Sequence, residues 1–176
     1  MKNNWYVITG APCSGKTTLL NELKRKGYKI VYEAARTLID REMKKGKKLL
    51  EIRKNEFEFQ RKVLRIKIQI EKRLSKKRIV FLERGIPDSF AYYEICGIKS
   101  DKYLKNISLS CFYKKIFILE ILDYKKDYSR TEDLNKAQNL EKLLEKDYRK
   151  LKFPLIKVPV MSIDKRVAFV LNNIDL

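Results

Sequence analysis

The 176-residue sequence contains no histidine and only three cysteines, none of them in a CxxC spacing. These absences argue against a Cys/His zinc site and a disulfide framework, and they favour a reducing compartment such as the cytoplasm. No apolar run approaches the roughly 18 residues that would span a bilayer, and the first residues lead into a short apolar segment rather than a secretory signal. We therefore expect one soluble, cytoplasmic domain over residues 1–176.

Acidic residues are scarce relative to basic ones. The chain has 22 Asp and Glu against 41 Lys and Arg, a formal net charge of +19. Residues 44–78 carry 15 Lys or Arg against 4 Asp or Glu, a net charge of +11. Such a stretch attracts nucleic acid or an anionic membrane surface. Because nothing in the sequence indicates a basic patch interleaved with exposed aromatic residues, lysines on a solvated helix face are the favoured interpretation.

Short β-branched segments alternate with amphipathic segments along the whole chain. The predicted strands are 5–9, 28–32, 78–82, 115–119 and 155–158. The predicted helices are 16–26, 34–45, 49–75, 87–95, 134–151 and 162–172. This alternation predicts an α/β fold with a parallel sheet covered on both faces.

The segment after the first predicted strand matches the phosphate-binding pattern G-x-x-x-x-G-K-[ST] of a P-loop. Two glycines allow the backbone to curl, so that N–H groups face a phosphate at the start of the next helix. Lys16 can reach the β- and γ-phosphates, and the Thr17 hydroxyl can ligate Mg²⁺. The predicted nucleotide-binding residues are Gly10, Ala11, Pro12, Cys13, Ser14, Gly15, Lys16, Thr17 and Thr18.

A second candidate pair, Glu33 and Arg36, follows the second predicted strand. The carboxyl ends of parallel strands line the ligand crevice in open α/β sheets. Glu33 there is a candidate base for an attacking hydroxyl, and Arg36 lies on the same face if a helix begins at residue 34. A helix-start glutamate beside a surface arginine explains the pair equally well.

A third group, Glu83 and Arg84, follows the third predicted strand. Glu83 occupies the place where P-loop proteins carry the acidic residue that orders Mg²⁺. Arg84 is a candidate for holding a phosphoryl oxygen or for pairing with Glu33. For Asp88 the favoured interpretation is the N-cap of the next helix.

The polar segment 120–133 follows the fourth predicted strand and is a candidate lid. Arg130 is the residue predicted to supply charge to the transition state, with Lys125 and Lys126 nearby. An ordinary solvated loop is the alternative.

Five stretches together resemble the AAA-type P-loop family of predicted ATPases and kinases that includes the ribosylnicotinamide kinase domain of the bacterial NadR protein. The stretches are ITGAPCSGKTTL, YEAARTLID, FLERGIPDSFAYY, DYSRTED and VPVMSIDKRVAFVLNNI. The resemblance implies a single P-loop NTPase domain with a five-stranded sheet in the kinase-like order 2-3-1-4-5. Glu33 and Glu83-Arg84 are similar, more distantly, to the catalytic acid and the Glu-Arg pair of deoxynucleoside kinases. The family usually has an Asp-Arg pair where this chain has Glu83-Arg84.

These features predict a kinase that transfers the γ-phosphoryl of ATP to a hydroxyl of a nucleoside- or vitamin-like acceptor. Lys16, Glu33, Arg84 and Arg130 would be catalytic, Thr17 and Glu83 would bind Mg²⁺, and Glu33, Arg36 and Glu83 would line the acceptor site. The acceptor is expected between the end of the second strand and the long basic helix. ATP is favoured over GTP because no guanine-reading Asn-Lys-x-Asp motif is present. The alternatives are a nucleotide-dependent switch or slow NTPase that binds a protein, anionic lipid or nucleic acid through its basic helices.

Overall fold

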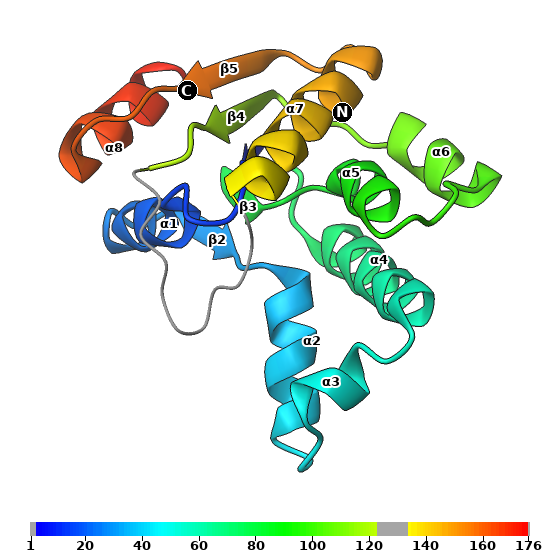
Figure 1. Ribbon diagram of the computed structural model, residues 1–176. Helices are drawn as coiled ribbons and strands as arrows, with labels where there is room; N and C mark the ends of the chain where they lie inside the picture. Colours follow the sequence, from blue (N-terminus) through cyan, green and yellow to red (C-terminus); the bar gives the residue numbers. More distant parts are fainter. Residues whose placement is uncertain (1–2, 123–133, 176) are drawn as a thin grey trace.

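The computed structural model describes residues 3–122 and 134–175 (Figure 1). These residues form a five-stranded sheet, parallel throughout, in the order β2-β3-β1-β4-β5. Its strands are β1 (Trp5–Thr9), β2 (Lys29–Val31), β3 (Val80–Glu83), β4 (Lys115–Leu119) and β5 (Leu155–Val158). The predicted α/β class and strand order are confirmed.

Helices connect the strands and cover the sheet. They are α1 (Lys16–Arg25), α2 (Ala34–Met43), α3 (Leu49–Ile52), α4 (Glu56–Arg73), α5 (Asp88–Ile95), α6 (Lys102–Leu109), α7 (Leu134–Lys150) and α8 (Ile163–Asn172). Figure 1 shows α2 and α3 extending away from the sheet. Within the described residues no helix combines the length and the apolar character needed to cross a membrane.

The core follows from the two-residue period of the central strands. In β1, Tyr6 and Ile8 face a cluster that includes apolar residues of α1 and α8. Trp5 and Val7 face the opposite cluster, which includes Tyr148 of α7. Because β1, β3 and β4 are apolar at nearly every position, they are buried from both sides, as the inner strands of a parallel sheet must be.

The structure differs from the predicted helices in two places. The helix expected over residues 49–75 is two helices, because Asn55 begins α4 and its side chain accepts a hydrogen bond from the backbone N–H of Glu58. Helix α6 was not predicted, and it begins in the same way, since the Asp101 side chain accepts from the backbone N–H of Leu104.

The strand register brings the candidate residues to one edge of the sheet. Ile8 of β1 pairs with Glu83, and Val31 of β2 pairs with Leu82 of β3. Thr9 of β1 pairs with Ile118 of β4. The segments that follow β1, β2 and β3 therefore leave the sheet side by side.

Candidate active site

The loop between β1 and α1 uses backbone conformations that residues with a Cβ rarely adopt. Gly10 has φ +141°, Gly15 has φ +79°, and Cys13 between them is also left-handed at φ +63°. A Cβ at Gly10 would lie 2.5 Å from the carbonyl oxygen of Leu119, so a side chain there would displace β4. The loop curls ahead of the N-terminus of α1, an arrangement in which backbone N–H groups collect an anion.

Lys16, the first residue of α1, turns back into this loop and is 6% exposed. Its Nζ donates to the carbonyl oxygen of Ala11 at 2.7 Å and to Ser14 Oγ at 3.1 Å. Burial, followed by repulsion from Arg84, lowers the pKa of Lys16 to about 7, against the opposing effect of nearby carboxylates. A phosphate in the loop would stabilise the ammonium form and raise this pKa.

Thr17 and Glu83, the two predicted magnesium ligands, lie next to each other. Thr17 Oγ1 donates to Glu83 Oε1 at 2.9 Å, which joins the first turn of α1 to the end of β3. A hydroxyl and a carboxylate fit Mg²⁺, because this ion binds through one or two protein oxygens and completes its shell with phosphates and water. These two side chains would hold the ion beside the loop.

An ion pair between Glu33 and Arg84 joins the ends of β2 and β3. Arg84 Nε donates to Glu33 Oε1 at 3.0 Å, and Arg84 Nη1 donates to the carbonyl oxygen of Gly10 at 3.0 Å. The guanidinium also lies over the Tyr92 ring, 5.0 Å from its centroid. Arg84 has φ +66°, a conformation that costs free energy and is maintained by these contacts. The arginine thus fixes the predicted base relative to the phosphate loop.

The Glu33 carboxyl is held ionised by its surroundings. Burial acts to raise its pKa, but Arg84, Lys16 and Lys67 outweigh burial and lower the pKa below the usual value. Glu33 occupies the N-cap position of α2 without making a capping hydrogen bond. The side chain is therefore directed to the site, and it is unprotonated at neutral pH, as a proton acceptor must be.

Asp88 is not the helix cap that was expected. Pro87 occupies the cap position of α5, and the fully buried Asp88 carboxylate accepts from the backbone N–H of Gly85 at 2.9 Å. It also accepts hydrogen bonds from the hydroxyls of Thr9 and Tyr148. Arg84 Nη1 lies 3.5 Å from Asp88 Oδ1. Asp88 therefore fixes the turn after β3 and joins it to β1 and α7.

Helix α4 contributes a buried lysine and a half-buried glutamate to the same turn, and the sequence analysis singled out neither of them. Lys67 Nζ donates to the carbonyl oxygen of Gly85 at 2.9 Å. The Tyr113 hydroxyl donates to Glu71 Oε1 at 2.8 Å and accepts from the backbone N–H of Ile86 at 3.1 Å. Burial raises the pKa of Glu71 to about 7. The sequence did hold one indication of this role, because Lys67 lies among the regularly spaced apolar residues that α4 buries.

The cleft expected to receive the acceptor is nearly closed. Between α4 and the ends of β2 and β3 it holds about 10 Å³, room for at most one water molecule. Tyr32, Lys67, Glu71 and Arg84 are among its lining residues. A second hollow of about 170 Å³ between α2 and α4 shares Ile70 with this cleft. An acceptor would have to widen the cleft toward that hollow.

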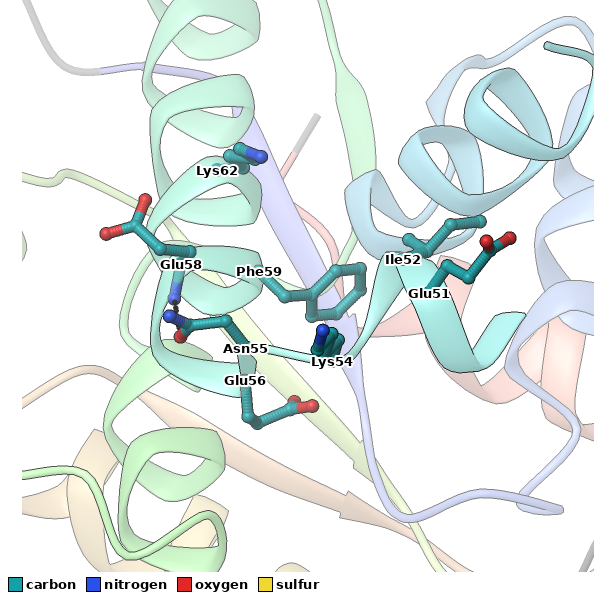
Figure 2. Close-up of a pocket in the computed structure, with 8 residues that line it drawn as sticks. All are labelled: Glu51, Ile52, Lys54, Asn55, Glu56, Glu58, Phe59 and Lys62. Atoms are coloured by element: carbon teal, nitrogen blue, oxygen red, sulfur yellow. Dashed lines mark hydrogen bonds between the residues drawn. The ribbon is translucent and has the colours of Figure 1, made fainter. Parts of the chain in front are cut away.

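A larger hollow of about 600 Å³ lies at the junction of α3 and α4 (Figure 2). All its lining residues belong to the segment 51–62. Figure 2 shows the apolar side chains of Ile52 and Phe59 among glutamates and lysines. No predicted site residue contributes to it, so the hollow plays no part in the arrangement above.

One predicted residue, Arg36, is not brought into the site, and another, Arg130, lies outside the described residues. Arg36 is exposed on α2, and in the described part of the chain Glu33 pairs with Arg84 instead. Arg130 and all but the first three residues of the lid-like segment 120–133 lie outside the described residues. The proposed roles of that segment stay predictions.

A family model described as an AAA domain matches residues 5–166, from β1 into α8. The chain belongs to this AAA domain family. The match includes the phosphate loop, the Glu33–Arg84 pair and Glu83. No curated protein matches the chain.

Several solved structures share the fold of this AAA domain protein. A thymidylate kinase from Ehrlichia chaffeensis has a TM-score of 0.68 at 15% identity, covering 96% of both chains. A deoxyadenosine kinase from M. mycoides with bound dATP has a TM-score of 0.62 at 15% identity, covering 96% of this chain and 97% of the other. A shikimate kinase from Aquifex aeolicus vf5 has a TM-score of 0.59 at 19% identity, covering 96% and 94%. At these identities the likeness concerns the fold.

Proposed function

We propose that this protein is a small-molecule kinase that transfers the γ-phosphoryl of Mg·ATP to a hydroxyl of a nucleoside- or vitamin-like acceptor. The observation that carries the proposal is the ion pair of Glu33 with Arg84, which places an ionised carboxylate beside the phosphate loop. A protein that only binds nucleotide has no need for a held proton acceptor there. The solved structures that share its fold are named as kinases of small molecules, which supports this choice.

The phosphates are bound by the loop before α1 and by Lys16. The ammonium lies at the bottom of this loop and neutralises charge on the β- and γ-phosphates. Thr17 and Glu83 would hold Mg²⁺, which would supply further charge neutralisation at the phosphate oxygens. These contacts orient the γ-phosphoryl toward the end of β2.

The acceptor hydroxyl approaches from the cleft between β2 and α4. Glu33 Oε1 or Oε2 accepts its proton as the oxygen attacks phosphorus, and the bond to the ADP oxygen breaks in line. Arg84 stabilises charge on the transferring oxygens while it keeps Glu33 in place. Because the free cleft has room for only one water, acceptor binding moves side chains and excludes water from the phosphoryl group.

A panel of acceptors tests the proposal. The protein is incubated with γ-labelled ATP, Mg²⁺ and single nucleosides, vitamins and other hydroxyl compounds, and labelled product is separated from free phosphate. The proposal predicts label in at least one acceptor, and loss of this transfer in Glu33→Gln. Steady release of free phosphate that no acceptor diverts would instead identify a switch or slow NTPase. Unlabelled GTP added in competition would show whether ATP is the preferred donor.

A further inference from the structure

Arg166 is a buried arginine of α8 that has no place in the site as described so far. It is 2% exposed, and its side chain leaves the first turn of the helix toward the phosphate loop. Nη1 donates to the carbonyl oxygen of Ser14 at 2.6 Å. Nε donates to the carbonyl oxygen of Pro159 at 3.1 Å, and Nη2 donates to that of Glu120 at 3.3 Å. One guanidinium therefore joins the phosphate loop to the segments that follow β4 and β5.

The charge of Arg166 is not cancelled by a partner in the described part of the chain. Every hydrogen-bond partner above is a backbone carbonyl, and no carboxylate of the described residues lies within ion-pair distance. Burial lowers the pKa of the guanidinium, and Glu120 opposes this effect. Arginine nevertheless stays charged in proteins, so the positive charge persists. Such a charge is costly to bury unless it serves an anion or fixes structure.

The guanidinium also packs directly on the loop. A Cβ placed on Gly15 would lie 3.3 Å from Arg166 Nη1 and 3.2 Å from a methyl carbon of Leu122. Gly15 precedes Lys16, the first residue of α1, where backbone N–H groups face a bound phosphate. Arg166 thus contacts the loop at the Ser14 carbonyl, which in a planar trans peptide points in the direction opposite to the Gly15 N–H.

We propose that Arg166 is a positioning residue of the nucleotide site, which fixes the Ser14–Gly15 backbone against the ends of β4 and β5 and adds positive charge behind the phosphate loop. This rests on the proposed nucleotide binding and adds a residue from the opposite end of the chain. The planar fork of donors is essential, because a lysine ammonium keeps the charge but cannot reach three carbonyls that lie in three directions.

Two variants and a matched control test the inference. Arg166→Met removes charge and donors, whereas Arg166→Lys keeps the charge. Lys165→Met removes one charge from an exposed neighbour on the same helix. Circular dichroism first establishes a temperature at which each variant is folded. Titration calorimetry with Mg·ATP then gives the dissociation constants, and KM for ATP and for an acceptor is measured where transfer is observed.

Both Arg166 variants are expected to bind Mg·ATP roughly 10- to 100-fold more weakly, with the KM of the acceptor unchanged. Lys165→Met should bind like the wild type. The inference is overturned if Arg166→Met binds within twofold of the wild type, if Arg166→Lys restores full affinity, or if Lys165→Met loses as much. If Arg166→Met does not fold, Arg166→Lys decides the question. A wild-type protein that binds no Mg·ATP would instead contradict the proposed function.

Discussion

The phosphate half of the site is built chiefly from backbone, whereas the acceptor half is built from side chains. Around the phosphates, left-handed residues such as Gly10 and Gly15 shape a loop that Arg166 supports from behind. At the proposed acceptor position, Arg84 pairs with Glu33 and, with Lys67, lines a cleft that has room for one water. The first half is preorganised for an anion that every nucleotide carries. The second half depends on side chains that can differ between proteins of the same fold, and for this reason we propose that it selects the acceptor.

The largest expected effect comes from the acceptor half. Glu33→Gln keeps the size of the side chain but removes the proton acceptor, so turnover should fall roughly 10²- to 10⁴-fold while Mg·ATP affinity changes little. Asp40→Asn, an exposed change on the same helix, is the control and should be neutral. Rates of labelled transfer and calorimetric affinities would be measured together. If Glu33→Gln transferred phosphate at the wild-type rate, Glu33 would not be the catalytic base.

Glu83→Gln should act on the phosphate half instead. This variant lacks the carboxylate beside Thr17, so the affinity of the site for Mg²⁺ should fall. Half-maximal activity should then require roughly tenfold more Mg²⁺. Saturating Mg²⁺ should restore most of the turnover, which it cannot do for Glu33→Gln. If Glu33→Gln and Glu83→Gln showed the same dependence on Mg²⁺, the two glutamates would not have the separate roles assigned to the two halves of the site.

A proton should accompany nucleotide binding. The pKa of Lys16 is lowered to about 7 in the free protein, and bound phosphates raise it. At pH 8 Lys16 is mostly neutral in the free protein, so nucleotide binding should take up close to one proton. At pH 6 Lys16 is already charged, and the proton uptake should vanish. Calorimetry in buffers of different ionisation enthalpy measures this number. Equal uptake at both pH values would show that another group is responsible.

The smallest effect is expected from the basic stretch. Lys72, Arg73, Lys76 and Lys77 are all exposed, and no ion pair involves them within the described residues. Arg73 lines the hollow beside the acceptor cleft and is left unchanged. Replacing Lys72, Lys76 and Lys77 by Gln should leave transfer to a small acceptor within about twofold of the wild type, because exposed charges contribute little to a distant buried site. Binding to RNA and to anionic vesicles at two salt concentrations would be compared in parallel. A strong, salt-dependent loss of either would favour a partner bound through these helices.

Two kinds of feature in the site could be predicted from the sequence: those set by a local motif, and those set by the carboxyl ends of parallel strands lying at one edge of the sheet. The phosphate loop follows from its motif, and the meetings of Thr17 with Glu83 and of Glu33 with Arg84 follow from parallel strands that end at one edge. Arg36 is exposed on α2, as the alternative interpretation expected, and Glu33 pairs with Arg84. A role of Arg36 at the acceptor site stays a prediction.

The remaining residues could not be predicted, because their contacts join distant segments. Asp88 binds hydroxyls from β1 and α7, and Arg166 binds carbonyls of three loops, neither of which has a local signature. The break before α4 did have one. Asn55 followed by Glu58 is a helix-start pattern, but the continuous apolar periodicity outweighed it.

The most direct test of the account is the thermal stability of the wild type and of Lys16→Ala with and without millimolar Mg·ATP. A ligand that binds only the folded state, present at 100 times its dissociation constant, adds about 2.7 kcal/mol to the free energy of unfolding. The account predicts a clear rise in Tm for the wild type and loss of most of that rise in Lys16→Ala. An unchanged wild-type Tm, or an equal rise in both proteins, would contradict nucleotide binding at this loop.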